Sequence, residues 1–466
     1  MKLSSKALLA LAISSITATA YAEPVSQDFV PTTLAGTSAQ SEAKGFIEDF
    51  SLGGTTRNWY SHESKYRGGT FSYEKHGVTR TDRNRTNWVQ GTILNASSGF
   101  TQGTVGVKTE VAVYNALVLD RSKRDIKGGS NRTLADSDGN AVDQWSKLGL
   151  ANVQFRVSNT TLTAGRQNFS SGIVDTIGNR ALPSSFEGVS FNSEEFSNLS
   201  FQGGVFDRVS PRTEQSLSKF RTEYTSNSNV ETDKVYTLGA NYQPFKSLKT
   251  SIFGANVKDF WNQYYFGATH ELGDSQTLAL TTGLNYYKTV DEGKKLMGDI
   301  DNDTYSLSLG LTHQAHSLTF AYQAVNGNEY FDYLHETNGI YLANSLTSDF
   351  NGPNEKSFQI AYGINMAEYG VPGLKFNVYS ARGWGIDGTH YTGNRGVVGK
   401  GYDGIQVQDG EKHQEYGVGS SYAIQSGPLK ATTVRATYVE HRGSEFQSDG
   451  SIKEFRLVTT IPFNIL

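Results

Sequence analysis

The amino-acid sequence predicts an all-β fold, a transmembrane antiparallel β-barrel of about eighteen strands. Three observations lead to this fold class. The chain begins with an export signal, and the rest of it has no apolar run long enough for a membrane-spanning helix. Apolar and polar residues alternate with period two from about residue 45 to the end. The connections between these segments are short and long in strict alternation along the chain.

Residues 1–22 have the features of a bacterial secretory signal peptide. Two lysines precede the apolar run of residues 7–16, and Ala20-Tyr21-Ala22 forms a small-x-small cleavage site. The apolar run is too short to anchor the chain in a membrane. We therefore expect the mature chain to begin at residue 23 and to open with a flexible leader, residues 23–44, which is polar and has no regular pattern.

The composition favours strands and turns over helices. The 466 residues include 49 glycines, 25 tyrosines and 25 phenylalanines but only 3 methionines. There are no cysteines, which excludes disulfides and thiolate metal sites. The mean hydropathy of −0.45 resembles that of a soluble protein, but alternating strands cancel in such an average. The mild net charge of −4 gives no overall case for nucleic-acid binding.

The alternation assigns the two faces of each strand. In residues 305–311, a tyrosine and three leucines alternate with serines and a glycine. Near the C-terminus, Val434, Ala436 and Tyr438 alternate with Arg435 and its polar neighbours. An arginine that faces lipid at mid-strand costs about 2–4 kcal/mol. We therefore expect the Val434 face to meet lipid and Arg435 to point into a water-filled lumen.

The connections fall into two kinds. The short ones lie near Ser98-Gly99, Ser158-Asn159, Phe196-Ser197, Pro244-Phe245, Gly273-Asp274, Gln314-Ala315, Tyr369-Gly370 and Ser426-Gly427. The long ones cover roughly residues 61–85, 119–146, 168–185, 208–232, 289–302, 327–355, 383–411 and 442–452, with one short exception near Asp259-Phe260. Strict alternation of the two kinds is typical of outer-membrane barrels, in which short turns are periplasmic and long loops lie outside. No internal boundary interrupts the pattern, so residues 45–466 are expected to form a single pore domain.

Several motifs occur in a fixed order along the mature chain, and the ordered set is far more specific than any one of them. They are GFIEDFSLGGTTRNWY, WVQGTILNASSGFTQGTVGV, RALPSSFEGVSF, YQAVNG, SDFNGPNEKSFQIAY, GVPGLKF, SGPLKATTVR and the closing EFRL and IPFNIL. In this order they resemble the OprD-type substrate-specific porins of Gram-negative outer membranes. The resemblance implies a barrel of about eighteen strands in the cell outer membrane, with a narrow pore constricted by inward-folded external loops. It also implies passive uptake of small carboxylate-bearing solutes, either amino acids or aromatic and other organic acids.

The resemblance further implies a ladder of basic residues in the lumen that guides the carboxylate through the barrel. Matched motif by motif, its candidates in this chain are Arg57, Lys375, Arg382, Arg435 and Arg456. Tyr379 stands where many members of the family have a basic residue, a gap that Lys375 on the same face partly fills. Arginine suits such a path because its planar fork matches a carboxylate and stays charged at any relevant pH. The alternative is that these arginines only neutralise carboxylates in the lumen.

By the same resemblance, two external loops are expected to form the constriction. The third external loop, about residues 168–185, ends in GNRALPSSFEG, in which Arg180 matches a basic position of the family motif, and Arg166 lies at the end of the strand that leads into this loop. The seventh contains Ser345 and Asp349, which resemble the polar, acidic side of the pore in family members that take up basic amino acids. These four residues complete the predicted constriction.

No catalytic residue, metal site or cofactor is expected. Asp299, Asp301 and Asp303 alternate as in a calcium loop, but the EF-hand positions for glycine and glutamate are not matched. No zincin or nucleophile-elbow motif occurs, so an outer-membrane barrel hydrolase is a weak alternative. A general diffusion porin with a wide lumen is the closer alternative, and an adhesin or structural barrel would have a blocked pore.

The expected partners are small-molecule carboxylates, outer-membrane lipid and lipopolysaccharide, with no nucleic acid. The resemblance allows a monomer or a loose homotrimer. Basic amino acids, aromatic acids and dicarboxylates all fit the pattern, so the sequence does not name the substrate.

Overall fold

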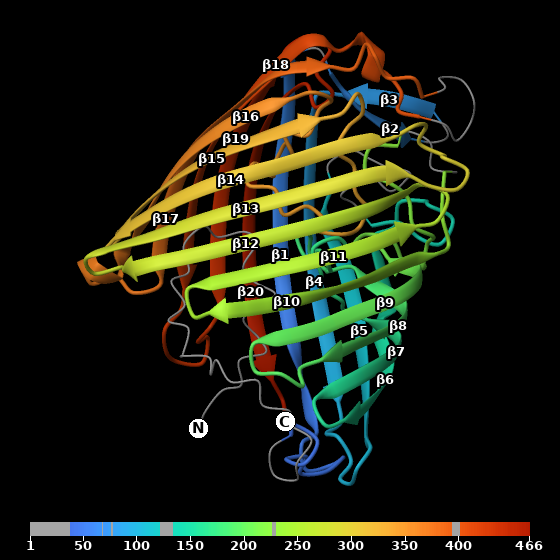
Figure 1. Cartoon of the computed structure of the whole chain (residues 1–466), viewed down its shortest axis with the longest axis vertical. Coiled ribbons are helices and arrows are strands. Elements are labelled where there is room, and N and C mark those ends of the chain that lie inside the picture. The colour runs from blue at the N-terminus through green and yellow to red at the C-terminus, as the bar shows by residue number, and fades with distance from the viewer. Residues whose placement is uncertain (1–37, 68, 76–77, 122–133, 226–229, 394–400) are drawn as a thin grey trace.

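A computed structural model describes residues 38–67, 69–75, 78–121, 134–225, 230–393 and 401–466. Within these residues, 18 strands form one antiparallel sheet that closes on itself, because β1 (Ser51–Arg67) pairs with both β4 (Asn84–Ser97) and β20 (Ser451–Asn464). Figure 1 shows β1 and β20, blue and red at the two ends of the chain, side by side. The predicted all-β barrel is confirmed. The predicted signal peptide and residues 23–37 of the leader lie outside the described residues.

The remaining barrel strands pair with their neighbours in chain order. Between β4 and β20 they are β5 (Gly106–Asp120), β6 (Gln144–Val157), β7 (Thr160–Gln167), β8 (Ser185–Ser193), β9 (Leu199–Ser210), β10 (Val235–Phe245), β11 (Leu248–Val257), β12 (Trp261–Asp274), β13 (Leu278–Asp291), β14 (Asp301–His313), β15 (His316–Asn326), β16 (Lys356–Asn365), β17 (Leu374–Asp387), β18 (Asp409–Ala423) and β19 (Thr433–Gly443). Outside this sheet lie the hairpin β2 (Phe71–Lys75) and β3 (Val78–Asp82) and the short 3-10 helices η2 (Met366–Tyr369) and η3 (Ile405–Val407). No helix among the described residues is long and apolar enough to cross a membrane.

The connections follow the predicted alternation. At one end of the barrel the strands are joined by short turns, such as residues 158–159 between β6 and β7. At the other end lie the long loops, among them the third (168–184), the fourth (211–234) and the seventh (327–355). The short external connection expected between two strands is found at residues 258–260. By the rule for outer-membrane barrels, the turn end is periplasmic and the loop end is external.

The side chains of each strand alternate between the lumen and the outer wall. In β14, Leu307 is 49% exposed on the outer wall, whereas Ser306 is buried on the lumenal side. In β19, Tyr438 is 41% exposed and its neighbour Val439 is buried. Lipid covers such exposed apolar side chains in a membrane, which explains why the outer wall carries so many of them. The predicted assignment of the two faces is confirmed.

The external loops fold inward and pack inside the barrel. One cluster of buried side chains joins Ile173 of the third loop, Phe220 of the fourth and Phe331 of the seventh. A second cluster packs Leu182 of the third loop against Trp59 of β1. The loops are therefore held by apolar contacts with the strands and with one another, and they lie where a constriction was expected.

The last residues of the predicted leader are held at the periplasmic mouth. The backbone amide of Gln40 donates to the carbonyl of Ser158 at 3.1 Å, and its side-chain amide donates to the carbonyl of Thr101 at 2.9 Å. Arg156 in turn donates to Gln40 Oε1 at 3.1 Å. Ser38 and Gln40 are buried here, within the segment predicted to be a flexible leader, because Gln40 satisfies polar groups of two turns that only the folded barrel brings together.

We predict that the two faces of β14 respond differently to charge. Leu307→Arg, at the middle of the strand, places an arginine in lipid and should cost about 2–4 kcal/mol of folding free energy. Ser308→Arg, one residue further, points into the lumen and should cost clearly less. Denaturant unfolding in lipid vesicles measures both changes. Equal losses for the two variants would contradict the assignment of the faces.

Candidate functional site

Three arginines lie on the lumenal face of three neighbouring strands. Arg57 is on β1, Arg456 on β20 and Arg435 on β19. Val458 of β20 lies opposite Arg435 on one side and opposite Trp59 on the other, and Trp59 is two residues from Arg57 along β1. Two strand spacings separate β19 from β1, which is about 10 Å across the sheet. The charges of Arg57 and Arg435, and those of Arg435 and Arg456, are close enough to repel each other.

Arg57 also holds the third external loop. Its Nη1 donates to the carbonyl oxygens of Gly178 at 2.7 Å and of Arg180 at 2.9 Å, and its Nε donates to Thr460 Oγ1 at 3.2 Å. All three acceptors are neutral groups. These bonds therefore fix the position of the Arg57 guanidinium without neutralising its charge.

The buried indole of Trp59 positions two further guanidinium groups. Arg180 lies with its guanidinium carbon 5.6 Å from the ring centre of Trp59, and that of Arg456 lies 5.8 Å from the same ring. Such contacts between a cation and an aromatic face are favourable. Arg456 also pairs with Glu454 at 2.8 Å. Four residues thus form what we call the lumenal arginine cluster: Arg57, Arg180, Arg435 and Arg456.

Lys375 joins this face from β17. Ser421 of β18 lies opposite both Lys375 and Arg435, so two strand spacings, about 10 Å, separate these two residues. Tyr379, at the expected gap in the ladder, donates its hydroxyl to Glu415 Oε1 at 2.5 Å. It lines a recess of about 190 Å³ together with Arg435. At the position where a basic residue was expected, the chain therefore has the neutral hydroxyl of Tyr379, which donates a hydrogen bond to Glu415.

Arg382 does not belong to the lumenal face. In β17, Tyr379 and the buried Ala381 occupy lumenal positions, whereas Arg382 has the parity of Val378, which is 50% exposed on the outer wall. Arg382 is itself exposed. Its prediction as a ladder residue is wrong, because successive side chains of a strand point to opposite faces.

Arg166 lies in the barrel wall and not at the constriction. Its Nη2 is 3.1 Å from Glu187 Oε2 on β8, and its Nη1 donates to the carbonyl of Leu148 on β6. Arg166 also has the parity of Leu162, which is 44% exposed on the outer wall. The expectation that Arg166 borders the constriction is corrected, since its charge is engaged with Glu187 across the strands.

Ser345 and Asp349, the two predicted constriction residues of the seventh loop, contact each other. The hydroxyl of Ser345 donates to Asp349 Oδ1 at 2.8 Å. The hydroxyls of Tyr224 in the fourth loop and Tyr333 in the seventh each donate to Asp349 Oδ2 at 2.8 Å. Burial raises the pKa of Asp349 to about 6, although these three donors work against the rise. The carboxyl group therefore changes its charge close to neutral pH.

A buried ion pair joins the fourth and seventh loops. Arg212 Nε lies 2.7 Å and Arg212 Nη2 3.2 Å from the two carboxylate oxygens of Glu336. Burial works to raise the pKa of Glu336, but Arg212 outweighs it and holds the pKa well below its usual range. The third loop joins through Asp175, which accepts from Asn338 at 3.2 Å and from Tyr341 at 3.0 Å. We call these three loops the loop unit. Sequence reasoning missed the ion pair because its partners are 124 residues apart.

A second buried polar cluster fastens the seventh loop to the wall. His413 of β18 contacts Glu355 Oε1 at 2.5 Å through Nε2 and His441 Nε2 of β19 at 2.7 Å through Nδ1. The hydroxyl of Ser348 donates to Asp449 at 2.6 Å. Donor atoms of His413, His441 and Asp449 lie within 4.8 Å of one another, a set of a kind that binds zinc. Spacing did not reveal these residues, because they come from two strands and the ninth external loop.

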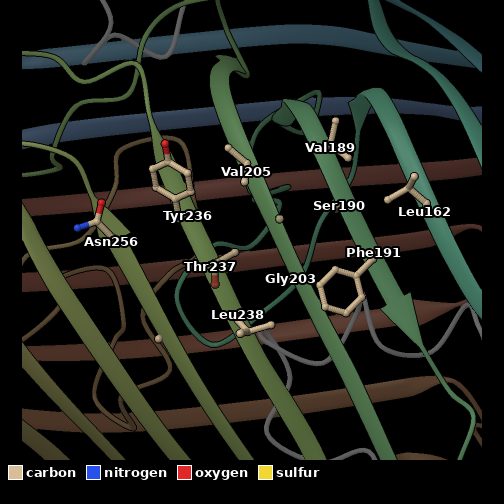
Figure 2. A pocket seen from close by; sticks show the side chains of 12 residues that line it. Leu162, Val189, Ser190, Phe191, Gly203, Val205, Tyr236, Thr237, Leu238 and Asn256 are labelled. Carbon is tan, nitrogen blue, oxygen red and sulfur yellow. The ribbon is translucent and has the colours of Figure 1, made fainter.

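A recess larger than the one lined by Tyr379 and Arg435 lies outside the pore. Figure 2 shows Leu162, Val189, Val205 and Tyr236 around it on neighbouring strands. All four side chains are exposed on the outer wall, and Gly203, which has no side chain, lines the space between them. This apolar groove of about 400 Å³ faces lipid, so it is not a candidate for the path of a polar solute.

Comparison with known proteins gives the family. The family described as "outer membrane porin, OprD family" matches residues 44–465. The chain belongs to the OprD family. It is 36% identical to Porin D of Pseudomonas aeruginosa over 439 residues, which are 92% of this chain and 94% of that protein. A Gram-negative outer-membrane location follows from the family and from the closed barrel.

Solved structures of OprD-family porins share the fold. The crystal structure of Pseudomonas aeruginosa OccD3 (OpdP) matches with a TM-score of 0.81 and 44% sequence identity, over 96% of each chain. That of Pseudomonas aeruginosa OccK2 (OpdF) in complex with glucuronate matches with a TM-score of 0.74 and 25% identity, over 91% of this chain and all of the other. These likenesses agree with the 18-stranded architecture found here.

We predict that the Arg212–Glu336 pair keeps the loop unit closed at neutral pH. Glu336→Gln leaves Arg212 buried without a charged partner, and breaking such a pair costs about 3–5 kcal/mol. Hydrogen exchange of the fourth and seventh loops should become faster at pH 7. Asp299→Asn is the control, because its pair with Lys295 is exposed and should have no measurable effect on exchange.

The same pair sets a pH dependence. A carboxyl group whose pKa is depressed by folding stabilises the folded state above its unfolded pKa, about 4.3, and loses this contribution as the pH falls further. Exchange of the wild-type loops, corrected for the intrinsic effect of pH, should approach that of Glu336→Gln only below about pH 4. Unchanged protection in the variant at pH 7 would contradict the role of the pair.

Proposed function

We propose that this OprD-family porin is a selective channel for the passive uptake of small carboxylate-bearing solutes. The observation that carries the proposal is the gathering of basic side chains on one lumenal face. Arg57, Lys375, Arg435 and Arg456 come from four strands between β17 and β1, and Arg180 reaches them from the third loop. Charged side chains at a narrow point recruit ions of the opposite sign. A carboxylate is the expected ligand, because guanidinium groups bind it through two parallel hydrogen bonds.

The spacing of these residues suits passage rather than tight binding. Measured across the sheet, neighbouring members of this row of basic residues are no more than two strand spacings apart, about 10 Å, so a carboxylate is close to the next cation when it leaves one. Arg57 bonds to neutral acceptors, whereas Arg456 is paired with Glu454. The row is therefore a series of sites of different strength, which permits both entry and release.

The seventh loop adds an acidic group beside this path. Its residues Leu346 and Thr347 line the same recess as Arg435 and Arg456. Asp349 lies two residues further along the loop and is ionised above its pKa of about 6. A solute with both a carboxylate and a cationic end, such as a basic amino acid, therefore finds a partner for each.

Two further observations support a selective channel. A general diffusion porin needs a wide lumen, whereas here the third, fourth and seventh loops are bonded to one another inside the barrel. The related OccK2 barrel was crystallised with glucuronate, which is a carboxylate. The proposed path lies within one barrel, so it is compatible with a monomer and with a loose homotrimer. The relatives are porins, which argues against the alternative of a barrel hydrolase.

We predict that removing a lumenal arginine shortens the binding of carboxylates. In planar-bilayer recordings, benzoate should cause brief blocking events, and Arg435→Ala should shorten them about tenfold or more, since a charge-assisted hydrogen bond contributes about 1.5–3 kcal/mol. Arg382→Ala is the matched control from the outer wall and should leave the events unchanged. A large conductance that changes neither with benzoate nor with either substitution would contradict the proposal and favour a general diffusion porin.

A second prediction concerns Asp349. Blocking events caused by the amino acid arginine should shorten as the pH falls through about 6, because the carboxyl group becomes neutral below its pKa. Asp349→Asn should give short events at every pH from 5 to 8 and so abolish this dependence. Benzoate events, which need no acidic partner, serve as the control and should not follow the same titration. Persistence of the pH dependence in Asp349→Asn would assign it to another group.

A further inference from the structure

Five basic side chains gather on the outer wall, at the external ends of five consecutive strands. They are Lys356 of β16, Arg382 of β17, Lys412 of β18, Arg442 of β19 and Lys453 of β20. Each has the parity of an exposed apolar or aromatic residue of its own strand: Phe358, Val378, Tyr416, Tyr438 and Phe455. We call these five residues the outer basic patch.

The strand register brings the five cations close together. Arg382 and Arg442 both lie opposite Gln414, so two strand spacings, about 10 Å, separate them. Lys356 and Lys412 both lie opposite Trp384 and are separated in the same way. The two pairs are offset by two residues along the strands, so the four cations form a staggered group. Lys453 lies beside this group on β20, opposite Glu440 of β19.

The patch carries a clear excess of positive charge. Glu440 of β19 shares the parity of Tyr438, and it accepts from Arg442 Nε at 2.7 Å and lies 3.9 Å from Lys453 Nζ. Glu411 of β18 has the opposite, lumenal parity. Among the described residues, Lys356, Arg382 and Lys412 take part in no ion pair. Two of the five cations are therefore engaged with Glu440, and three are not engaged with a carboxylate.

Another part of the outer wall shows that such an excess is not a general property of the external rim. Lys288 of β13 also points outward near the external end of its strand, with the parity of the exposed Tyr286. It lies 2.5 Å from Asp301 and 2.6 Å from Asp303, both on β14. Its charge is more than balanced by these two neighbours, in contrast to the outer basic patch.

Aromatic side chains place the patch at the depth of lipid headgroups. Trp384 is exposed between Lys356 and Lys412, and the guanidinium carbon of Arg442 lies 5.9 Å from the ring centre of Tyr416, which is also exposed. Lys453 Nζ lies 4.8 Å from the ring centre of Tyr66. Tryptophan and tyrosine mark the membrane–water interface, where the cost of a cation on the lipid face becomes small.

We propose that the outer basic patch binds the phosphate groups of the glycolipid that fills the external leaflet of the outer membrane. This lipid, lipopolysaccharide, was expected above only as a general neighbour of the barrel. Phosphates are the natural partners of a group of arginines and lysines, since they offer several charged oxygen acceptors. The two staggered pairs suit a headgroup with two phosphates, and the apolar outer wall below them suits its acyl chains. The proposal concerns the outer wall alone and does not depend on what passes through the lumen.

The test is lipid binding by the purified, folded barrel, measured by native mass spectrometry with diphosphoryl lipid A as the probe. The triple variant Lys356→Gln, Arg382→Gln, Lys412→Gln removes the cations that form no ion pair. Each basic side chain near an anionic lipid surface strengthens binding roughly fivefold, so the triple variant should bind about a hundredfold more weakly. Lys288→Gln is the matched control and should bind like the wild type. Unchanged channel conductance in planar bilayers shows that each variant is folded.

The lipid is varied to separate this proposal from simple attraction to any anionic membrane. Monophosphoryl lipid A should bind more weakly than the diphosphoryl form, and phosphatidylglycerol more weakly still. Equal binding of phosphatidylglycerol and diphosphoryl lipid A would overturn the proposal, as would undiminished binding by the triple variant or an equal loss in Lys288→Gln. If the triple variant does not fold, Arg382→Gln alone should lower the affinity roughly fivefold, and no change in that variant would overturn the proposal too.

Discussion

The structure depends on one constraint: in lipid, every backbone amide and carbonyl must find its hydrogen-bond partner within the protein. An open sheet cannot meet this constraint, because its edge strands leave a row of groups unpaired. Here β1 pairs on one side with β4 and on the other with β20, so the 18 strands have no edge. Closure gives each strand a lipid-facing side and a lumenal side. The alternating sequence, the apolar outer wall and the polar interior all follow from it.

A barrel of this size leaves an interior that strand side chains alone do not fill. The external loops narrow it, and they need internal partners because some of their polar groups leave water. The Arg212–Glu336 pair, the hydroxyl donors around Asp349 and the cluster around His413 supply these partners. Arg57 links this packing to the proposed function, since it holds the third loop through neutral carbonyls and keeps its charge in the lumen. The same bonds that stabilise the loops therefore place the arginine cluster.

Two arginines of similar sequence context have opposite positions. Arg435 and Arg382 both lie in strands and both match a family motif, yet Arg435 faces the lumen and Arg382 faces outward. One residue of register separates the two faces of a strand, so a motif match without a parity test leaves the face undecided. In β17 the parity was available from the sequence, because Val378 and Arg382 are four residues apart and share a face. The outward position of Arg382 is what leads to the outer basic patch.

The sequence by itself determined the barrel, its short turns and long loops, and the lumenal side of Arg57, Lys375, Arg435 and Arg456. It did so because strand periodicity and turn composition are local properties of the sequence. In addition, a polar side chain placed on the lipid-facing side of a strand is costly, which keeps the alternation regular. Only the tertiary structure decided how the loops are held and which residues surround each charge. Arg212 and Glu336 meet across 124 residues of sequence, and Arg180 reaches Trp59 only because the third loop folds inward. Such contacts depend on the closure of the barrel, which brings distant segments into one enclosed space that no local pattern of residues describes.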